Sequence, residues 1–116
     1  MTNSNTKRDQ AADALRTVSP DKAFYFYKGI GLPLGATSKS LSEFATIVKG
    51  IDPSSIRFHV ERGDFESWFR MLGDKTLASQ VAALRGKKIS PDELRGKLSS
   101  IVGARVDQLY AVAASK

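Results

Sequence analysis

The side chains best suited to chemistry are gathered in one stretch, Ser55–Leu72, with the sequence SIRFHVERGDFESWFRML. It holds the only histidine of the chain, His59, and the only tryptophan, Trp68. Because histidine titrates near neutral pH, His59 could serve as an acid, a base or a pH switch. No nucleophile stands at a recognisable spacing beside it, so we identify no catalytic residue and expect a non-enzymatic protein. We expect His59 to be structural, with ring nitrogens that bond to a backbone carbonyl or to Asp64.

The sequence favours neither a metal site nor a cofactor site. The chain has no cysteine, so the other ligands beside His59 would all be carboxylates. The glycine-containing segment Lys28–Lys39 precedes a predicted helix, but it lacks the GK[ST] ending of a P-loop and the spacing of a dinucleotide fingerprint. We therefore expect no metal, no cofactor and no small-molecule substrate.

Positive charge is concentrated in the last quarter of the chain. The net charge is +6, and residues 85–116 supply +4 of it, from seven basic and three acidic side chains. A clustered positive field attracts polyanions through counterion release, whereas a solvated surface with scattered charge only aids solubility. The candidate phosphate contacts are Arg85, Lys87, Lys88, Arg95 and Lys97, with Lys28 and Lys39 as further ones.

Trp68 and the pair Arg62 and Asp64, all near His59 in the sequence, are predicted to have structural roles. Trp68 could stack on bases if it were exposed, but it follows Phe65 at helical spacing, which favours a core position. Arg62 and Asp64 flank Gly63, and we expect Asp64 to cap the following helix and to pair with Arg62.

The last predicted helix contains residues that indicate an interface. Arg105 falls within its apolar stripe, so an ion pair or an interface position is expected. Small residues at Gly96, Ser100 and Gly103 lie on the opposite side. Each glycine inside a helix lowers the stability of the fold by about 1 kcal/mol relative to alanine. Close approach of another chain, as in a homodimer, or of a phosphate backbone would explain why glycines are present here. The alternative is that the helix simply tolerates them.

Helix caps and turns predict the elements that position these residues. Ser40–Glu43 and Ser90–Glu93 are capping boxes, and Asp52-Pro53 is typical of a helix start. The fold class is therefore mainly α, a compact bundle of about five short helices. Residues 1–7 are predicted to be a disordered tail and residues 8–116 a single globular domain.

One or two short strands, near residues 23–27 and 55–60, complete this prediction. The segment 23–27, AFYFY, alternates like a strand but needs a partner, and residues 28–39 are predicted to be a loop. Ile56–Glu61 also alternates with period 2, yet the cap signals before it favour a helix. That choice stays open.

Location is predicted from what the sequence lacks. No apolar run approaches the ~18 residues that span a bilayer. The first ten residues, MTNSNTKRDQ, have no hydrophobic signal core. We expect a cytoplasmic protein without a membrane partner.

Four landmarks resemble the pattern of a known family. They are SLSEF at 40–44, IDPSSIRFH at 51–59, RGDFESWF at 62–69 and LGDKTLA at 72–78. Together they resemble a small domain of unknown function found in archaea and bacteria, with the pattern SLxEF, SIxFH, RGDFxxW and LGDxxLA. The resemblance covers about residues 23–110. It implies a compact, mostly helical domain and supplies no catalytic residue.

The leading functional hypothesis is a small basic protein that binds DNA, or RNA, without sequence preference. In size and charge alone the chain also resembles small archaeal proteins that coat DNA, which would place it at the nucleoid. The alternative is a protein-interaction or homo-oligomeric module without nucleic acid.

Overall fold

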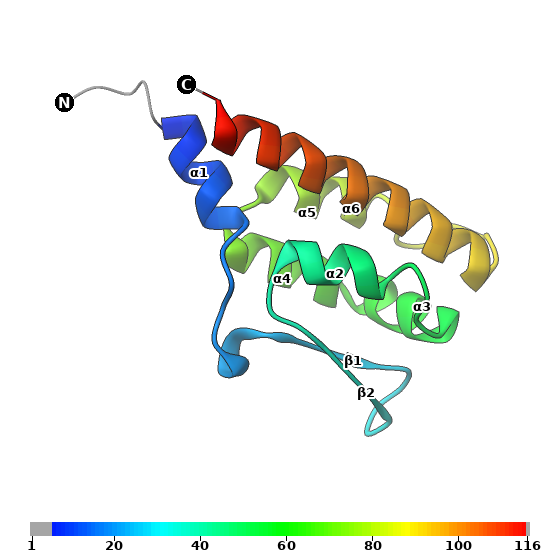
Figure 1. Cartoon of the computed structure of the whole chain (residues 1–116). Helices are drawn as coiled ribbons and strands as arrows, with labels where there is room; N and C mark the ends of the chain where they lie inside the picture. Colours follow the sequence, from blue (N-terminus) through cyan, green and yellow to red (C-terminus); the bar gives the residue numbers. More distant parts are fainter. Residues whose placement is uncertain (1–5, 116) are drawn as a thin grey trace.

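The computed structural model describes residues 6–115, and its elements are mainly helical (Figure 1). Six α-helices, one short 3-10 helix and two strands occur in this part of the chain. In chain order they are α1 (Thr6–Ala14), η1 (Pro20–Lys22), β1 (Phe24–Tyr27), β2 (Pro33–Ser38), α2 (Leu41–Ile47), α3 (Pro53–Arg62), α4 (Asp64–Leu72), α5 (Lys75–Ala82) and α6 (Pro91–Ala114). The mainly α fold with a short strand at 23–27 is confirmed.

The long helix α6 runs along one side of the bundle, and the strands lie on the opposite side of the middle helices (Figure 1). α1, α2, α3 and α5 all pack against α6, whereas β1 packs against α3 and β2 against α2. The helix α6 buries one stripe of residues spaced three or four apart, which is the spacing of a single helix face. These residues are Leu94, Leu98, Val102, Val106 and Leu109.

Aromatic rings fill the space between the strands and the middle helices. Phe24 of β1 lies 4.9 Å, centroid to centroid, from Phe26 and 5.1 Å from Phe65. Phe44 of α2 stacks on Trp68 at 5.7 Å. Aromatic pairs at these separations add to the free energy gained by burial itself. This cluster holds β1 in place, although the sheet has only two strands.

The partner of β1 is β2, within the same chain. The strands are antiparallel, with Phe24 opposite Ser38 and Tyr27 opposite Pro33. The prediction of a loop over residues 28–39 is therefore wrong for 33–38. The register of the pairing shifts between Tyr25 and Tyr27. On β2, opposite this shift, Gly35 adopts φ +77°. The pairing also removes the need for an external strand on that side of β1.

The segment 55–60 belongs to α3, so a strand there is excluded. Asp52 accepts a hydrogen bond from the backbone N–H of Ser54, and Pro53 occupies the first turn. The helix ends at Gly63, which has φ +76°. Caps at both ends outweigh the period-2 pattern of the apolar residues.

The N-terminal helix differs from its predicted bounds. It begins at Thr6, inside the segment predicted to be disordered, and residues 1–5 lie outside the described part. It ends at Ala14. The guanidinium of Arg8 donates to the backbone carbonyl of Ser115 at 2.9 Å, which ties the start of α1 to the end of α6.

Candidate binding surfaces

His59 is buried where β1 meets α3 and α4, and both ring nitrogens have partners. Nε2 accepts a hydrogen bond from the backbone N–H of Tyr27 at 2.9 Å. Nδ1 lies 2.8 Å from a carboxylate oxygen of Asp64, to which it donates. This pair of bonds requires the neutral ring. Burial lowers the pKa of His59 below its usual value, although the bond to Asp64 opposes the shift. The predicted partner Asp64 is confirmed, and the second partner is an N–H rather than a carbonyl.

The turn at Gly63 is closed by charge pairing. Nε of Arg62 lies 3.3 Å from Asp64, as predicted. The guanidinium of Arg62 also lies 4.9 Å from the centre of the Phe58 ring. Asp64 is the first residue of α4 and not its cap, since Gly63 occupies that position and no side chain caps it. Its carboxylate is directed to His59 and Arg62 instead.

Trp68 belongs to the core, as its spacing predicted. Only 8% of the residue is exposed. Its indole N–H donates to the backbone carbonyl of Lys22 at 2.8 Å, which fixes η1 against α4. The ring is therefore not free to stack on a base.

An open groove of about 630 Å³ runs along β1, between this strand and the α3–α4 corner. Tyr25, Ile30 and Met71 line it, and each is a large apolar or aromatic residue that stays exposed. Lys22 and Arg62 contribute positive charge to the same lining. The alternating residues of AFYFY predicted the strand. They did not predict which helices would form the opposite wall of the groove.

Two arginines of the predicted basic cluster form ion pairs and hydrogen bonds with other residues of the same chain. Arg85 forms an ion pair with Glu66, a residue that is only 6% exposed. Arg95 donates to the backbone carbonyl of Ile51 at 2.7 Å and lies 3.7 Å from Asp92. Their guanidinium groups therefore join segments of the fold, which reduces their availability to a ligand.

Three lysines of the cluster remain exposed, and none has an ion-pair partner among the described residues. They are Lys87, Lys88 and Lys97, named here the lysine edge. The turn that carries Lys87 and Lys88 is held by Arg57, which donates to the backbone carbonyls of Lys87 and Ile89. Sequence reasoning missed Arg57, because its partners lie thirty or more residues away.

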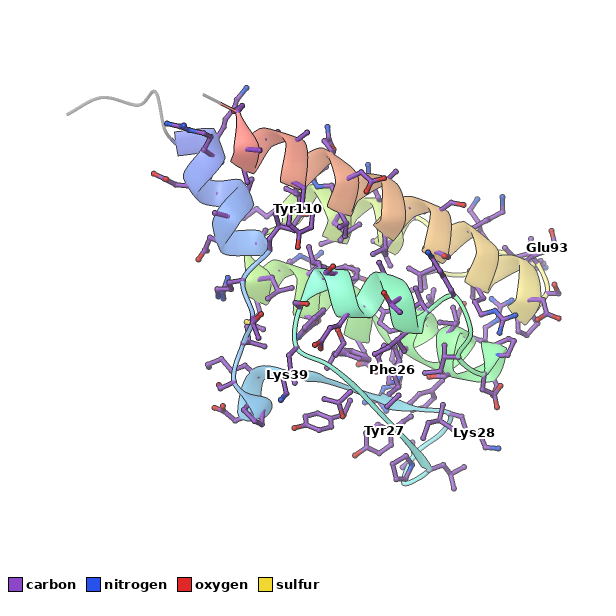
Figure 2. The ribbon with its side chains drawn as sticks, viewed as in Figure 1. Phe26, Tyr27, Lys28, Lys39, Glu93 and Tyr110 are labelled. Carbon is purple, nitrogen blue, oxygen red and sulfur yellow. The ribbon has the colours of Figure 1, made fainter. Side chains whose placement is uncertain are left out.

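Lys28 and Lys39 lie apart from each other. Lys39 precedes α2, whereas Lys28 follows β1 at the other end of the strands (Figure 2). The hydroxyl and backbone N–H of Ser54 lower the pKa of Asp52, and the charges of Lys28 and Arg95 lower it further. Arg95 lies near the start of α3, because it donates to the backbone carbonyl of Ile51.

The small residues of α6 face open space. A Cβ placed on Gly96 or on Gly103 would meet no neighbouring atom within 4 Å. Gly96 and Ser100 line a shallow groove of about 730 Å³ together with Lys87, Lys97 and Glu93. Packing within the described chain therefore does not require these glycines.

Arg105 forms an ion pair, one of the two outcomes expected for it. Its guanidinium donates to both oxygens of Asp74, at 2.8 and 3.0 Å, and to the side chain of Gln108. Asp74 is buried, and it also accepts the backbone N–H of Leu77 as the cap of α5. The pair joins α6 to the start of α5, and the sequence alone did not reveal Asp74 as the partner.

No cluster of three or more potential metal ligands occurs among residues 6–115. No helix in this part of the chain is long and apolar enough to cross a membrane.

Comparisons with known proteins identify a family. A model described as a family of unknown function (DUF5752) matches residues 4–103. The comparison with curated proteins found no match, and neither did the comparison with solved structures.

Proposed function

The chain belongs to this family of unknown function, and from its surface we propose that it binds nucleic acid without sequence preference. The contacts would be made to phosphates by the lysine edge, Lys87, Lys88 and Lys97. A cytoplasmic, nucleoid-associated location follows from this proposal.

The observation that supports it best is the groove at the start of α6. Lys87 and Lys97 line this groove, and Gly96 and Ser100 present no bulky side chain there. A phosphodiester backbone could thus approach the helix closely while both ammonium groups reach its oxygens. Glu93 lines the same groove, so the local field is less positive than the lysines alone would make it.

The structure also limits the number of contacts. Arg85 and Arg95 already bind Glu66 and the Ile51 carbonyl. If the three lysines each neutralise one phosphate, the slope of log affinity against log salt is about −3 on duplex DNA. Phosphate contacts alone carry no sequence information, which is why we propose no base preference.

Fluorescence anisotropy with a labelled random-sequence duplex tests the proposal. We expect binding at ~50 mM salt that weakens with the slope given above. Replacement of all three lysines of the edge by alanine should remove most of the salt dependence. Absence of binding by the unchanged protein would refute the proposal.

A matched control separates the lysine edge from overall charge. The control variant replaces Lys7, Lys22 and Lys75, three exposed lysines that line other cavities. Both variants lose the same charge, so equal loss of binding would show that net charge alone matters. Loss confined to the lysine-edge variant supports a defined contact surface.

A further inference from the structure

Arg57 of α3 fixes the backbone on both sides of Lys88, in the turn of the lysine edge. Its guanidinium donates to the backbone carbonyl of Lys87 at 3.1 Å and also to that of Ile89. Arginine can hold two carbonyls at once because its donors lie in one rigid plane. The side chain of Ile89 is partly buried and packs against the core. The backbone from Lys87 to Ile89 is therefore attached to the helices at two points.

Glu61 holds the beginning of the same turn. It lies one helical turn after Arg57 on α3, and its carboxylate accepts the backbone N–H of Gly86 at 3.1 Å. The same carboxylate lies 3.3 Å from Nη1 of Arg57. Gly86 adopts φ +78°, a conformation that other residues rarely adopt. We name Arg57 and Glu61 together the turn clamp.

The third lysine of the edge, Lys97, belongs to α6, so its backbone is fixed by the helix. All three ammonium groups thus extend from backbone that is ordered before a ligand arrives. A site ordered in advance loses less conformational freedom on binding. This advantage is largest for a ligand whose phosphates are also held in fixed positions, as they are along a double helix.

The groove beside the lysine edge offers no surface on which bases could stack. Among the described residues that line it none is aromatic: they are Leu84, Lys87, Glu93, Gly96, Lys97, Ser100 and Ile101. Tyr110, the exposed aromatic residue of α6, lies about 20 Å further along this helix than Lys97. Proteins that bind single strands usually gain affinity by stacking bases on aromatic side chains. This source of affinity for single strands is missing from the groove.

We propose that the lysine edge binds double-stranded nucleic acid in preference to single strands, and that the turn clamp positions its lysines for this ligand. The inference rests on the proposed function, because it concerns the same surface. Arg57 and Glu61 contact the backbone of the turn, so they are positioning residues. Their loss should change the preference for duplex without changing the number of phosphates that are neutralised.

Fluorescence anisotropy with a labelled DNA duplex, and with one of its strands alone, measures this preference at the same salt concentration. We expect the unchanged protein to bind the duplex at least about tenfold more tightly. The higher charge density of a duplex also favours it, so the comparison with variants isolates the contribution of positioning.

Arg57→Lys keeps the charge but cannot hold both carbonyls. The preference for duplex should fall to about threefold or less, while the slope of log affinity against log salt on the duplex stays at about −3. Arg62→Lys is the matched control, since it makes the same exchange on the same helix at a residue that pairs with Asp64 instead. This control should keep the preference of the unchanged protein.

Glu61→Leu separates positioning from charge. Removal of a carboxylate near the lysines should strengthen binding to both ligands if charge alone matters, with the preference unchanged. Loss of the bond to Gly86 should instead lower the preference for duplex. Hydrogen exchange of the Gly86 amide in the free protein should become faster in this variant, which verifies that the turn has loosened while slow exchange elsewhere shows that the fold is retained.

The outcomes distinguish this inference from the proposed function. Equal binding of both ligands, or tighter binding of the single strand, would overturn the inference and leave nucleic-acid binding intact. An unchanged preference in both clamp variants, with faster exchange at Gly86, would show that Arg57 and Glu61 only stabilise the turn. Absence of binding to either ligand by the unchanged protein would refute the proposed function, and the inference with it.

Discussion

The Nε2 atom of His59 accepts the backbone N–H of Tyr27 at 2.9 Å, so a single side chain joins α3 to the end of β1. A protonated ring has no acceptor at Nε2, and protonation would therefore break this bond. The same ring is held by Asp64 at 2.8 Å through Nδ1. Protonation of His59 would therefore remove one of the contacts that attach β1 to the helices, while the packing of Phe24 on Phe65 remains.

The stability of the protein should depend on pH through His59. Burial lowers its pKa in the folded state below the value of about 6.5 that applies when unfolded. At a pH between the folded and the unfolded pKa of His59, the unfolded chain binds more protons than the folded chain. The contribution of neutral His59 to the stability of the fold is therefore full above pH ~6.5 and is lost as the pH falls through the folded pKa. Urea unfolding between pH 5 and 7.5 measures this, with His59→Gln as control. A variant with the same pH dependence as the unchanged protein over this range would contradict the prediction.

Removal of Asp74 should destabilise the protein strongly. Asp74→Ala removes the cap of α5 and leaves Arg105 without its carboxylate in a largely buried place. We expect a loss of about 3–5 kcal/mol in the free energy of unfolding. Asp107→Ala, an exposed change on α6, should stay within about 0.5 kcal/mol.

The double variant Asp74→Ala with Arg105→Met checks that the ion pair causes this effect. It removes both charges, so its loss should be smaller than the sum of the two single losses. Simple additivity in chemical denaturation would show that the two residues act independently.

Two glycine substitutions should have opposite effects. Gly63 has φ +76°, and a Cβ there would lie 2.7 Å from the guanidinium of Arg85. Gly63→Ala should therefore cost at least about 1–2 kcal/mol. Gly103 lies within α6 with open space around it, so Gly103→Ala should stabilise the protein by about 0.5–1 kcal/mol. Thermal unfolding of both variants compares them directly, and destabilisation by Gly103→Ala would indicate that another chain packs at that glycine.

Local signals in the sequence predicted the helices better than the contacts between them. Ser40, Asp52 and Ser90 each cap a helix where the sequence placed its start. These signals are local because a cap and its partner lie within three residues. The bond between His59 and Asp64 spans five residues and was also predictable.

Features that depend on distant partners were not predictable. β2 has a proline, a glycine and only partly buried side chains, so its sequence shows no strand pattern and its pairing with β1 defines it. Arg105 was expected to pair, but Asp74 lies 31 residues away. Similarly, Arg85 was predicted to contact phosphate, whereas it pairs with Glu66, which is distant in the sequence.

The bond between Arg8 and the carbonyl of Ser115 brings the start of α1 beside the end of α6 (Figure 1). Their proximity means that a short connection could join these two ends without moving either helix. New ends could then be opened at Gly86, an exposed residue with φ +78° between α5 and α6. Such a circularly permuted chain would visit the helices in a different order while keeping the same core.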